Sequence, residues 1–150
     1  MKVFIGSDHA GYDLKEKLLQ FLIDLGYEVT DEGPFSFDPE DDYPDHVSEV
    51  AKEVADGGGE VKGIVLGGSG QGEAIVANRF KGVRAVVYYG GAGTIVRLSR
   101  EHNDANVLSI GARFVSEEEA KQAVKMWLET EFSGEERHLR RIKKIDQHGN

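Results

Sequence analysis

The sequence contains no cysteine. A disulfide framework, a thiolate nucleophile and a cysteine-ligated metal are therefore excluded. Positive charge is also scarce, because 18 Lys and Arg residues stand against 27 Asp and Glu residues, giving a formal net charge of −9. This balance argues against general affinity for nucleic acid or for anionic membranes.

Long apolar runs are missing as well. No stretch approaches the length of a transmembrane helix. The apolar core of residues 1–6 is far too short for a signal peptide, and Asp8 soon interrupts it. We therefore expect a cytoplasmic protein. The 150 residues, 39% hydrophobic and 30% charged, fit one globular domain spanning residues 1–150.

Short β-type runs alternate with segments whose apolar residues recur at helical spacing. This alternation predicts a parallel sheet covered by helices on both faces. The expected fold is a three-layer αβα, Rossmann-like sandwich with a five-stranded parallel sheet and an extra C-terminal helix. We expect strands at 3–5, 27–30, 63–66, 83–88 and 107–110, and helices at about 14–25, 47–55, 74–79, 95–103, 120–128 and 135–145.

A glycine-rich turn, residues 67–73 (GGSGQGE), follows the predicted central strand. Glycines let a ligand approach the backbone, and successive N–H groups before a helix form an anion pocket. Glu73, at the end of this turn, suits a base that removes a proton while the N–H groups hold an oxyanion. The alternative is an ordinary glycine-rich turn with a favourable acidic residue in the first helical turn. A P-loop would need Lys and Ser or Thr after its last glycine, and a dinucleotide fingerprint would need glycine in place of Glu73.

Polar residues flank other predicted strands. Asp8 and His9 follow the first strand, and His102 precedes the fifth. Ligands of open α/β sheets bind outside the carboxyl ends of the strands, and we expect these residues to meet Glu73 at that edge. Asp8 and His9 could form a hydrogen-bonded pair, although Asp8 could equally cap a helix. His102 could be a general acid and base, or a histidine favoured at a helix C-terminus.

Other candidates have similarly open alternatives. Ser69 could relay a proton or satisfy the turn, and Tyr43 could line a pocket or act as a packing anchor. Arg137 and Arg141 share a face of the last helix, with His138 beside them, and suit a phosphate group, as does Arg113. The alternative for the last helix is a solvated charged tail. The histidine spacings indicate no metal site.

Several motifs occur together and in order: Ser7-Asp8-His9-Ala10-Gly11, Asp42-Tyr43-Pro44, the glycine turn with Ala77-Asn78-Arg79, Arg100-Glu101-His102-Asn103, and Arg137-His138-x-x-Arg141. Over nearly the whole chain the sequence resembles the ribose-5-phosphate isomerase B family, which includes galactose-6-phosphate and allose-6-phosphate isomerases. The resemblance implies an aldose–ketose isomerase that needs no cofactor and acts through an enediolate. It also implies a homodimer, or a tetramer, with active sites shared between subunits and with His102 and Asn103 supplied by the partner.

Many members of that family use a cysteine just before the turn as the base. This chain has Gly67 there and resembles a branch in which a glutamate at position 73 takes the proton. The resemblance implies that Glu73 moves the proton from C2 to C1, Ser69 relays protons between O1 and O2, and His102, with Asp8, opens the furanose. It implies that the other substrate-binding residues are His9, Tyr43, Gly68, Gly70, Gln71, Gly72, Asn103, Arg113, Arg137, His138 and Arg141.

The resemblance leaves the sugar open. The glutamate branch also includes isomerases of four-carbon sugar phosphates, and the wider family includes isomerases of hexose 6-phosphates. A tetrulose 4-phosphate and a hexose 6-phosphate are therefore alternatives to ribose 5-phosphate as the substrate. The glycine-rich loop at 89–94 and the insert at 35–40 distinguish this sequence from the family pattern and could reshape the sugar pocket. Another alternative is a phospho-ligand binding domain without catalysis. A nucleotide-binding module is disfavoured by the glycine turn itself.

Overall fold

The computed structural model describes residues 1–148. Its centre is a five-stranded sheet in which all neighbouring strands are parallel, in the order β2-β1-β3-β5-β4. The strands are β1 (Lys2–Ser7), β2 (Glu28–Asp31), β3 (Val61–Gly67), β4 (Ala85–Tyr88) and β5 (Val107–Gly111). Every residue of the central strand β3 is buried, as expected for a strand covered on both faces.

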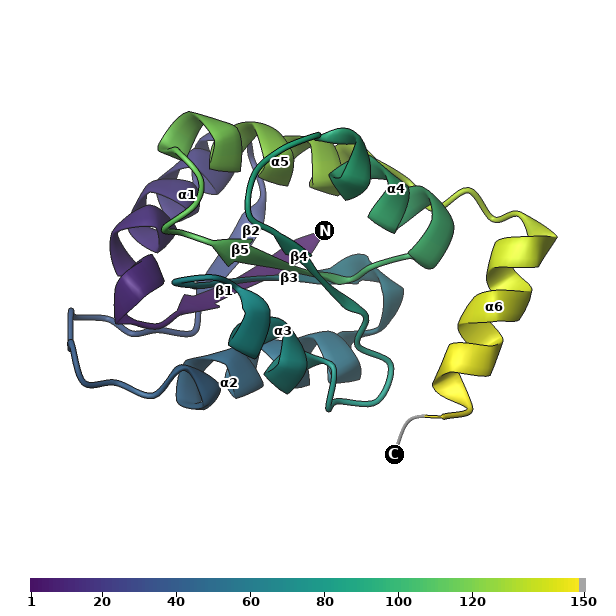
Figure 1. Ribbon diagram of the computed structural model, residues 1–150, viewed down its shortest axis with the longest axis horizontal. Helices are drawn as coiled ribbons and strands as arrows, with labels where there is room; N and C mark the ends of the chain where they lie inside the picture. Colours follow the sequence, from purple (N-terminus) through teal and green to yellow (C-terminus); the bar gives the residue numbers. More distant parts are fainter. Residues whose placement is uncertain (149–150) are drawn as a thin grey trace.

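Helices cover the two faces of the sheet (Figure 1). On one face lie α1 (Tyr12–Asp24), α4 (Thr94–Asn103) and α5 (Glu117–Glu129), and on the other lie α2 (Tyr43–Gly57) and α3 (Gln71–Ala77). Two short 3₁₀ helices, η1 (His9–Gly11) and η2 (Gly58–Glu60), follow β1 and α2. The last helix, α6 (Glu136–Asp146), stands apart from both layers. The predicted three-layer fold with an additional C-terminal helix is confirmed.

Each face of the sheet has its own core. Apolar residues of α1, α4 and α5 pack on one face, with Trp127 as the largest fully buried side chain. Valines and alanines of α2, such as Val50 and Val54, pack on the other. These residues recur at helical spacing in the sequence, which explains why the helix predictions were close. The main differences are at the ends: α5 starts earlier because Ser116 and Glu119 form a capping box.

The strand order locates the crevice where ligands of such folds bind. From β1 the chain first adds β2 on one side and then crosses to add β3 on the other. The connections after β1 and β3 therefore separate at the carboxyl edge, which creates a crevice between them. Asp8 follows β1 and the glycine turn follows β3, and the N–H of Asp8 donates to the Leu66 carbonyl (3.2 Å). The fold thus brings these two segments together.

Candidate active site

The glycine turn joins β3 to α3 in a conformation that requires glycine. Gly70 has φ 75°, in the left-handed region that favours glycine. A Cβ at Gly70 would also lie 3.0–3.1 Å from the backbone of Ile110 and Gly111 in β5. The Ser109 hydroxyl donates to the Gly70 carbonyl (2.6 Å), and the N–H of Gln71 donates to the Ser69 hydroxyl (3.3 Å). The turn is therefore fixed against β5.

Glu73 lies in the first turn of α3, and its side chain folds back beneath the glycine turn. The residue is only 4% exposed. Its carboxylate occupies the space beside Gly67: a Cβ at Gly67 would overlap Oε1 and Cδ of Glu73 and lie 2.6 Å from Oε2. Gly67 is thus needed to accommodate the carboxylate.

Burial also changes the acidity of this group. Desolvation raises the pKa of Glu73 above 4.5, the nearby charge of Asp8 raises it further, and a hydrogen bond from its own backbone N–H opposes both effects. A carboxylate with a raised pKa is a stronger base than a solvated one. The position and the electrostatics of Glu73 therefore suit proton abstraction.

A cavity of about 460 Å³ opens beside Glu73. Its size is that of a small-molecule site. Two glycines in its wall allow larger side chains to approach. A Cβ at Gly68 would lie 3.1 Å from Arg113 Nη1, and one at Gly72 would lie 2.7 Å from the ring of Tyr43. The lining residues are Asp8, Tyr43, Gly68, Ser69, Gly72, Glu73, Arg113 and Phe114.

Asp8 and His9 do not form the hydrogen-bonded pair that the sequence suggested. Asp8 caps η1, where its Oδ1 accepts from the Gly11 N–H (3.1 Å), and it also lines the cavity. The His9 Nδ1 instead lies 2.7 Å from Asp41 Oδ1, which also accepts from the His9 N–H (3.0 Å). His9 directly follows Asp8 in the sequence, but it does not line the cavity. Its side chain is oriented by the loop before α2.

Three residues near this site were missed by the sequence analysis. Asp41 holds His9, Phe37 packs edge-on against His9 (6.4 Å between ring centroids), and Phe114 lines the cavity. The insert at 35–40 signalled that the loop is unusual, and Phe37 belongs to it. Nothing in the local sequence indicated which side chain the loop would contact, because Asp41 and His9 are 32 residues apart.

The other predicted residues gather at a second place. His102 and Asn103 end α4, and the chain then enters β5 at its amino end. The expectation that His102 meets Glu73 at the carboxyl edge within one chain is therefore wrong: a loop before a parallel strand lies at the opposite edge from a loop after it. Figure 1 shows the end of α4 and α6 on the side of the sheet away from the start of α1.

His102 packs on α6. Its ring stacks on the ring of His138, with centroids 4.4 Å apart and planes at 16°. His138 is 4% exposed, and burial lowers its pKa below 6.5, with a further contribution from His102 and then from Arg137. Arg137 and Arg141 of α6 are exposed, and Arg137 Nε donates to Glu135 Oε2 (2.9 Å). This second group, made up of His102, Asn103, Arg137, His138 and Arg141, contains two histidines, an amide and two guanidinium groups but no base comparable to Glu73.

Among residues 1–148, no cluster of three or more His, Asp or Glu side chains has the arrangement of a metal site. Within the same range, no helix has the length and apolar character needed to cross a bilayer.

Comparison with known proteins gives a consistent result. A family model described as Ribose/Galactose Isomerase matches residues 3–145. The chain is 43% identical over 145 residues to ribose-5-phosphate isomerase B of Escherichia coli K12, covering 96% of this chain and 93% of that protein. It is 41% identical to the Mycobacterium leprae protein of the same name, covering 95% and 86% of the two chains.

Solved structures agree. Ribose-5-phosphate isomerase B of Mycoplasma genitalium, with bound ribulose-5-phosphate, superposes with a TM-score of 0.93 at 38% identity, covering 98% of this chain and 95% of that one. The Clostridium thermocellum enzyme gives a TM-score of 0.91 at 44% identity, with coverage of 98% and 96%.

Proposed function

The chain belongs to the ribose/galactose isomerase family, and from this premise we propose that it interconverts ribose 5-phosphate and ribulose 5-phosphate, with Glu73 as the base. Relatives that match nearly the full chain are named ribose-5-phosphate isomerase B, and one was solved with ribulose-5-phosphate bound. The observation that carries the role of Glu73 is its buried carboxylate, which fills the space beside Gly67 and lines the cavity.

The reaction needs one carbon-bound proton to move between neighbouring carbons. Glu73 takes the proton from C2 of the open-chain aldose, which leaves an enediolate, and returns it to C1. The proton of the hydroxyl group moves from O2 to O1, and Ser69 relays it. Backbone N–H groups of Gly70, Gln71 and Gly72 stabilise the enediolate oxygens, a contact worth about 3–4 kcal/mol when one donor is lost.

The remaining candidates bind the substrate and open its ring. His102, with Asp8, transfers the protons that open the furanose. Arg113, Arg137 and Arg141 bind the phosphate, for which guanidinium groups have a matching geometry. The other substrate contacts are assigned to His9, Tyr43, Gly68, Asn103 and His138.

These assignments require two chains. Within one chain, His102 lies at the opposite edge of the sheet from Glu73, and neither group has every function that the reaction needs. A homodimer solves this if its two-fold axis brings the end of α4 and α6 of one chain to the glycine turn of the other. We therefore assign His102, Asn103, Arg137, His138 and Arg141 to the partner's active site.

The decisive experiment measures ribulose 5-phosphate formation from ribose 5-phosphate by the wild type and by Glu73→Gln, without added metal. We expect turnover by the wild type, and a loss of several orders of magnitude with retained substrate binding in the variant. Glu131→Gln, an exposed substitution of the same type, is the control and should match the wild type. A fully active Glu73→Gln variant would remove Glu73 from the mechanism.

The sugar itself is tested with a panel. Ribose 5-phosphate should be turned over with a higher kcat/KM than a tetrulose 4-phosphate or a hexose 6-phosphate. Preference for either of the other sugars would keep the reaction class and change the substrate. Binding of all three without turnover would support a phospho-ligand binding domain instead.

A further inference from the structure

The helix that carries His102 and Asn103 ends in an unusual way. Asp104 follows Asn103 directly and has φ 45° and ψ 45°, the left-handed conformation. Among residues 1–148 it is the only residue other than glycine with positive φ. Glycine is the usual residue at such a helix end, and the backbone bond from Asp104 N–H to Arg100 O (3.1 Å) would form equally well with glycine. The aspartate side chain therefore has a separate reason to be there.

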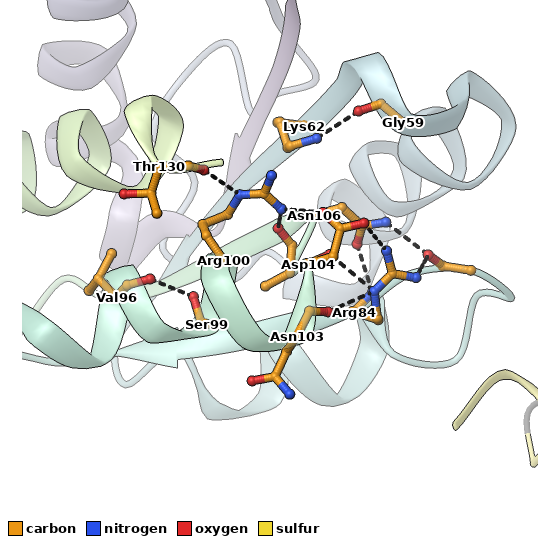
Figure 2. Close-up of polar contacts among 12 residues, drawn as sticks. Gly59, Lys62, Arg84, Val96, Ser99, Arg100, Asn103, Asp104, Asn106 and Thr130 are labelled. Atoms are coloured by element: carbon orange, nitrogen blue, oxygen red, sulfur yellow. Dashed lines mark hydrogen bonds and ion pairs between the residues drawn. The ribbon is translucent and has the colours of Figure 1, made fainter. Parts of the chain in front are cut away.

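That side chain joins two arginines, as Figure 2 shows. Asp104 Oδ2 accepts from Arg84 Nη2 (2.9 Å), and Oδ1 accepts from Arg100 Nη1 (2.7 Å). Arg84 lies just before β4, and its Nε donates to the carbonyls of both Asn103 and Asp104 (3.0 Å each). The last peptide groups of α4 are thus attached to the start of β4.

Arg100 connects the same turn to the chain that leads into α6. Its Nε donates to the Thr130 carbonyl at the end of α5 (3.1 Å), and its guanidinium group, in a residue only 7% exposed, lies over the Trp127 ring. The backbone carbonyl of the next residue, Glu101, accepts from the Ser133 N–H (3.1 Å). Because α6 otherwise stands apart from the sandwich, these bonds fix where it starts relative to His102.

The charges explain why an aspartate is required. Two guanidinium groups approach the Asp104 carboxylate, and Lys62, 4% exposed, lies in the same region, with Nζ donating to the Gly59 carbonyl (2.8 Å). Burial lowers the pKa of Lys62, the charge of Arg100 lowers it further, and Asp104 opposes this. Without the carboxylate, Arg84 and Arg100 would repel each other and the end of α4 would shift.

We propose that Asp104, held between Arg84 and Arg100, is a positioning residue that sets the placement of His102 and Asn103 relative to α6 for ring opening. This inference rests on the proposed isomerase function. In that function His102 and Asn103 act at a site that lies on another chain, so an error in the end of α4 is carried directly into the geometry of that site. Misplacement by about 1 Å can cost roughly 100-fold in rate.

The test separates proton abstraction from ring chemistry. Exchange of a C1 proton of ribulose 5-phosphate, an open-chain ketose, with D₂O needs Glu73 but no ring chemistry, whereas conversion of ribose 5-phosphate, which exists mainly as the furanose, needs both ring opening and Glu73. Exchange is measured at saturating ribulose 5-phosphate and conversion at saturating ribose 5-phosphate, both for Asp104→Gly, which keeps the left-handed turn but removes the carboxylate. We expect net conversion to fall by roughly ten-fold or more while exchange is largely retained. The ratio of exchange to conversion therefore rises.

Two further variants control this test. Asp104→Asn tolerates the left-handed conformation and keeps one acceptor oxygen, so it should fall between Asp104→Gly and the wild type. It is also the variant to use if Asp104→Gly does not fold. Arg97→Ala removes an exposed ion pair of α4 with Glu101 (3.9 Å) and should leave the ratio unchanged.

The outcomes are distinct. A merely structural role would lower exchange and conversion equally, through the amount of folded protein, and an unchanged ratio in folded Asp104→Gly or Asp104→Asn overturns the proposal. A wild type that shows neither exchange nor conversion contradicts the isomerase function itself. Wild-type activity with a raised ratio in the variants supports both.

Discussion

At the scale of single residues, the site depends on a glycine that has no side chain to contribute. Gly67 gives its space to the Glu73 carboxylate, which is held close to the glycine turn and largely shielded from water. Gly68 and Gly72 similarly allow Arg113 and Tyr43 to reach the cavity. The chemistry of the cavity is thus determined by which positions lack a Cβ as much as by which positions carry a charge.

Gly67→Ala should therefore impair the enzyme. The new Cβ would overlap the Glu73 carboxylate, so Glu73 must leave its position or the turn must shift. We expect kcat to fall by roughly 100-fold through misplacement of the base, and stability to fall by about 1–3 kcal/mol through overpacking. Steady-state kinetics and denaturant unfolding measure the two effects. Gly59→Ala is the matched control, because a Cβ there meets no atom within 4 Å; equal loss in both variants would contradict the argument.

The raised pKa of Glu73 predicts the acid side of the pH profile. As the proposed base, Glu73 must be ionised, and burial raises its pKa above 4.5, so on acidification kcat/KM should fall at a higher pH than an exposed glutamate would give. The same shift affects stability. A raised folded-state pKa favours the native state below the ordinary value, and this stability is lost as pH rises through the raised pKa. The Tm of Glu73→Gln minus that of the wild type should therefore increase from acid to neutral pH. A Tm difference that does not change with pH would show that the pKa of Glu73 is not raised.

At the scale of elements, α6 is the part whose attachment matters most. It carries Arg137 and Arg141, and its contact with α4 is the stack of His138 on His102. The apolar side chains Leu139 and Ile145 of α6 remain exposed in a single chain. In the proposed dimer these side chains are available to contact the partner.

Acid should loosen this helix. Burial lowers the pKa of His138 below 6.5, so the native state holds it neutral. The stability from this docking is fully present above the ordinary histidine pKa and is lost as pH falls through the lowered folded pKa. We expect amide hydrogen exchange in α6, measured relative to the intrinsic exchange rate at each pH, to accelerate at mildly acid pH in the wild type. This acceleration should be much reduced in His138→Leu and unchanged in His148→Asn, which alters an exposed histidine after the helix.

At the scale of the whole molecule, the two groups of candidate residues predict complementation between inactive chains. Glu73→Gln keeps the second group intact, and His102→Ala keeps the first. If sites are shared, unfolding and refolding an equal mixture restores one complete site in each mixed dimer, or about a quarter of wild-type activity. If each chain contained its own complete site, the mixture would be as inactive as its components. Size-exclusion chromatography with light scattering provides the oligomeric state.

The fold was largely predictable because its helices show regular apolar spacing and its buried strands are bounded by glycine. The glycine turn, Glu73 and Tyr43 were also identified from sequence, and the structure brings them to one cavity. The expectation that His102 lies at the carboxyl edge was wrong, although the predicted parallel topology already sends a loop before a strand to the opposite edge from a loop after one. The contact of Asp41 with His9 was missed because it depends on the path of a loop, for which sequence periodicity gives no information.

The overlap between position 67 and the Glu73 side chain also constrains how this active site can evolve. A lineage that moves its base from a side chain at position 67 to one at position 73 passes through an intermediate. That intermediate has either two side chains competing for one space or no base at all. On the proposed mechanism, each single step would impair proton abstraction, although the pair of changes would restore it. If Glu73 is the base, the steric overlap makes substitutions at the two positions interdependent, so that the effect of each depends on the residue at the other.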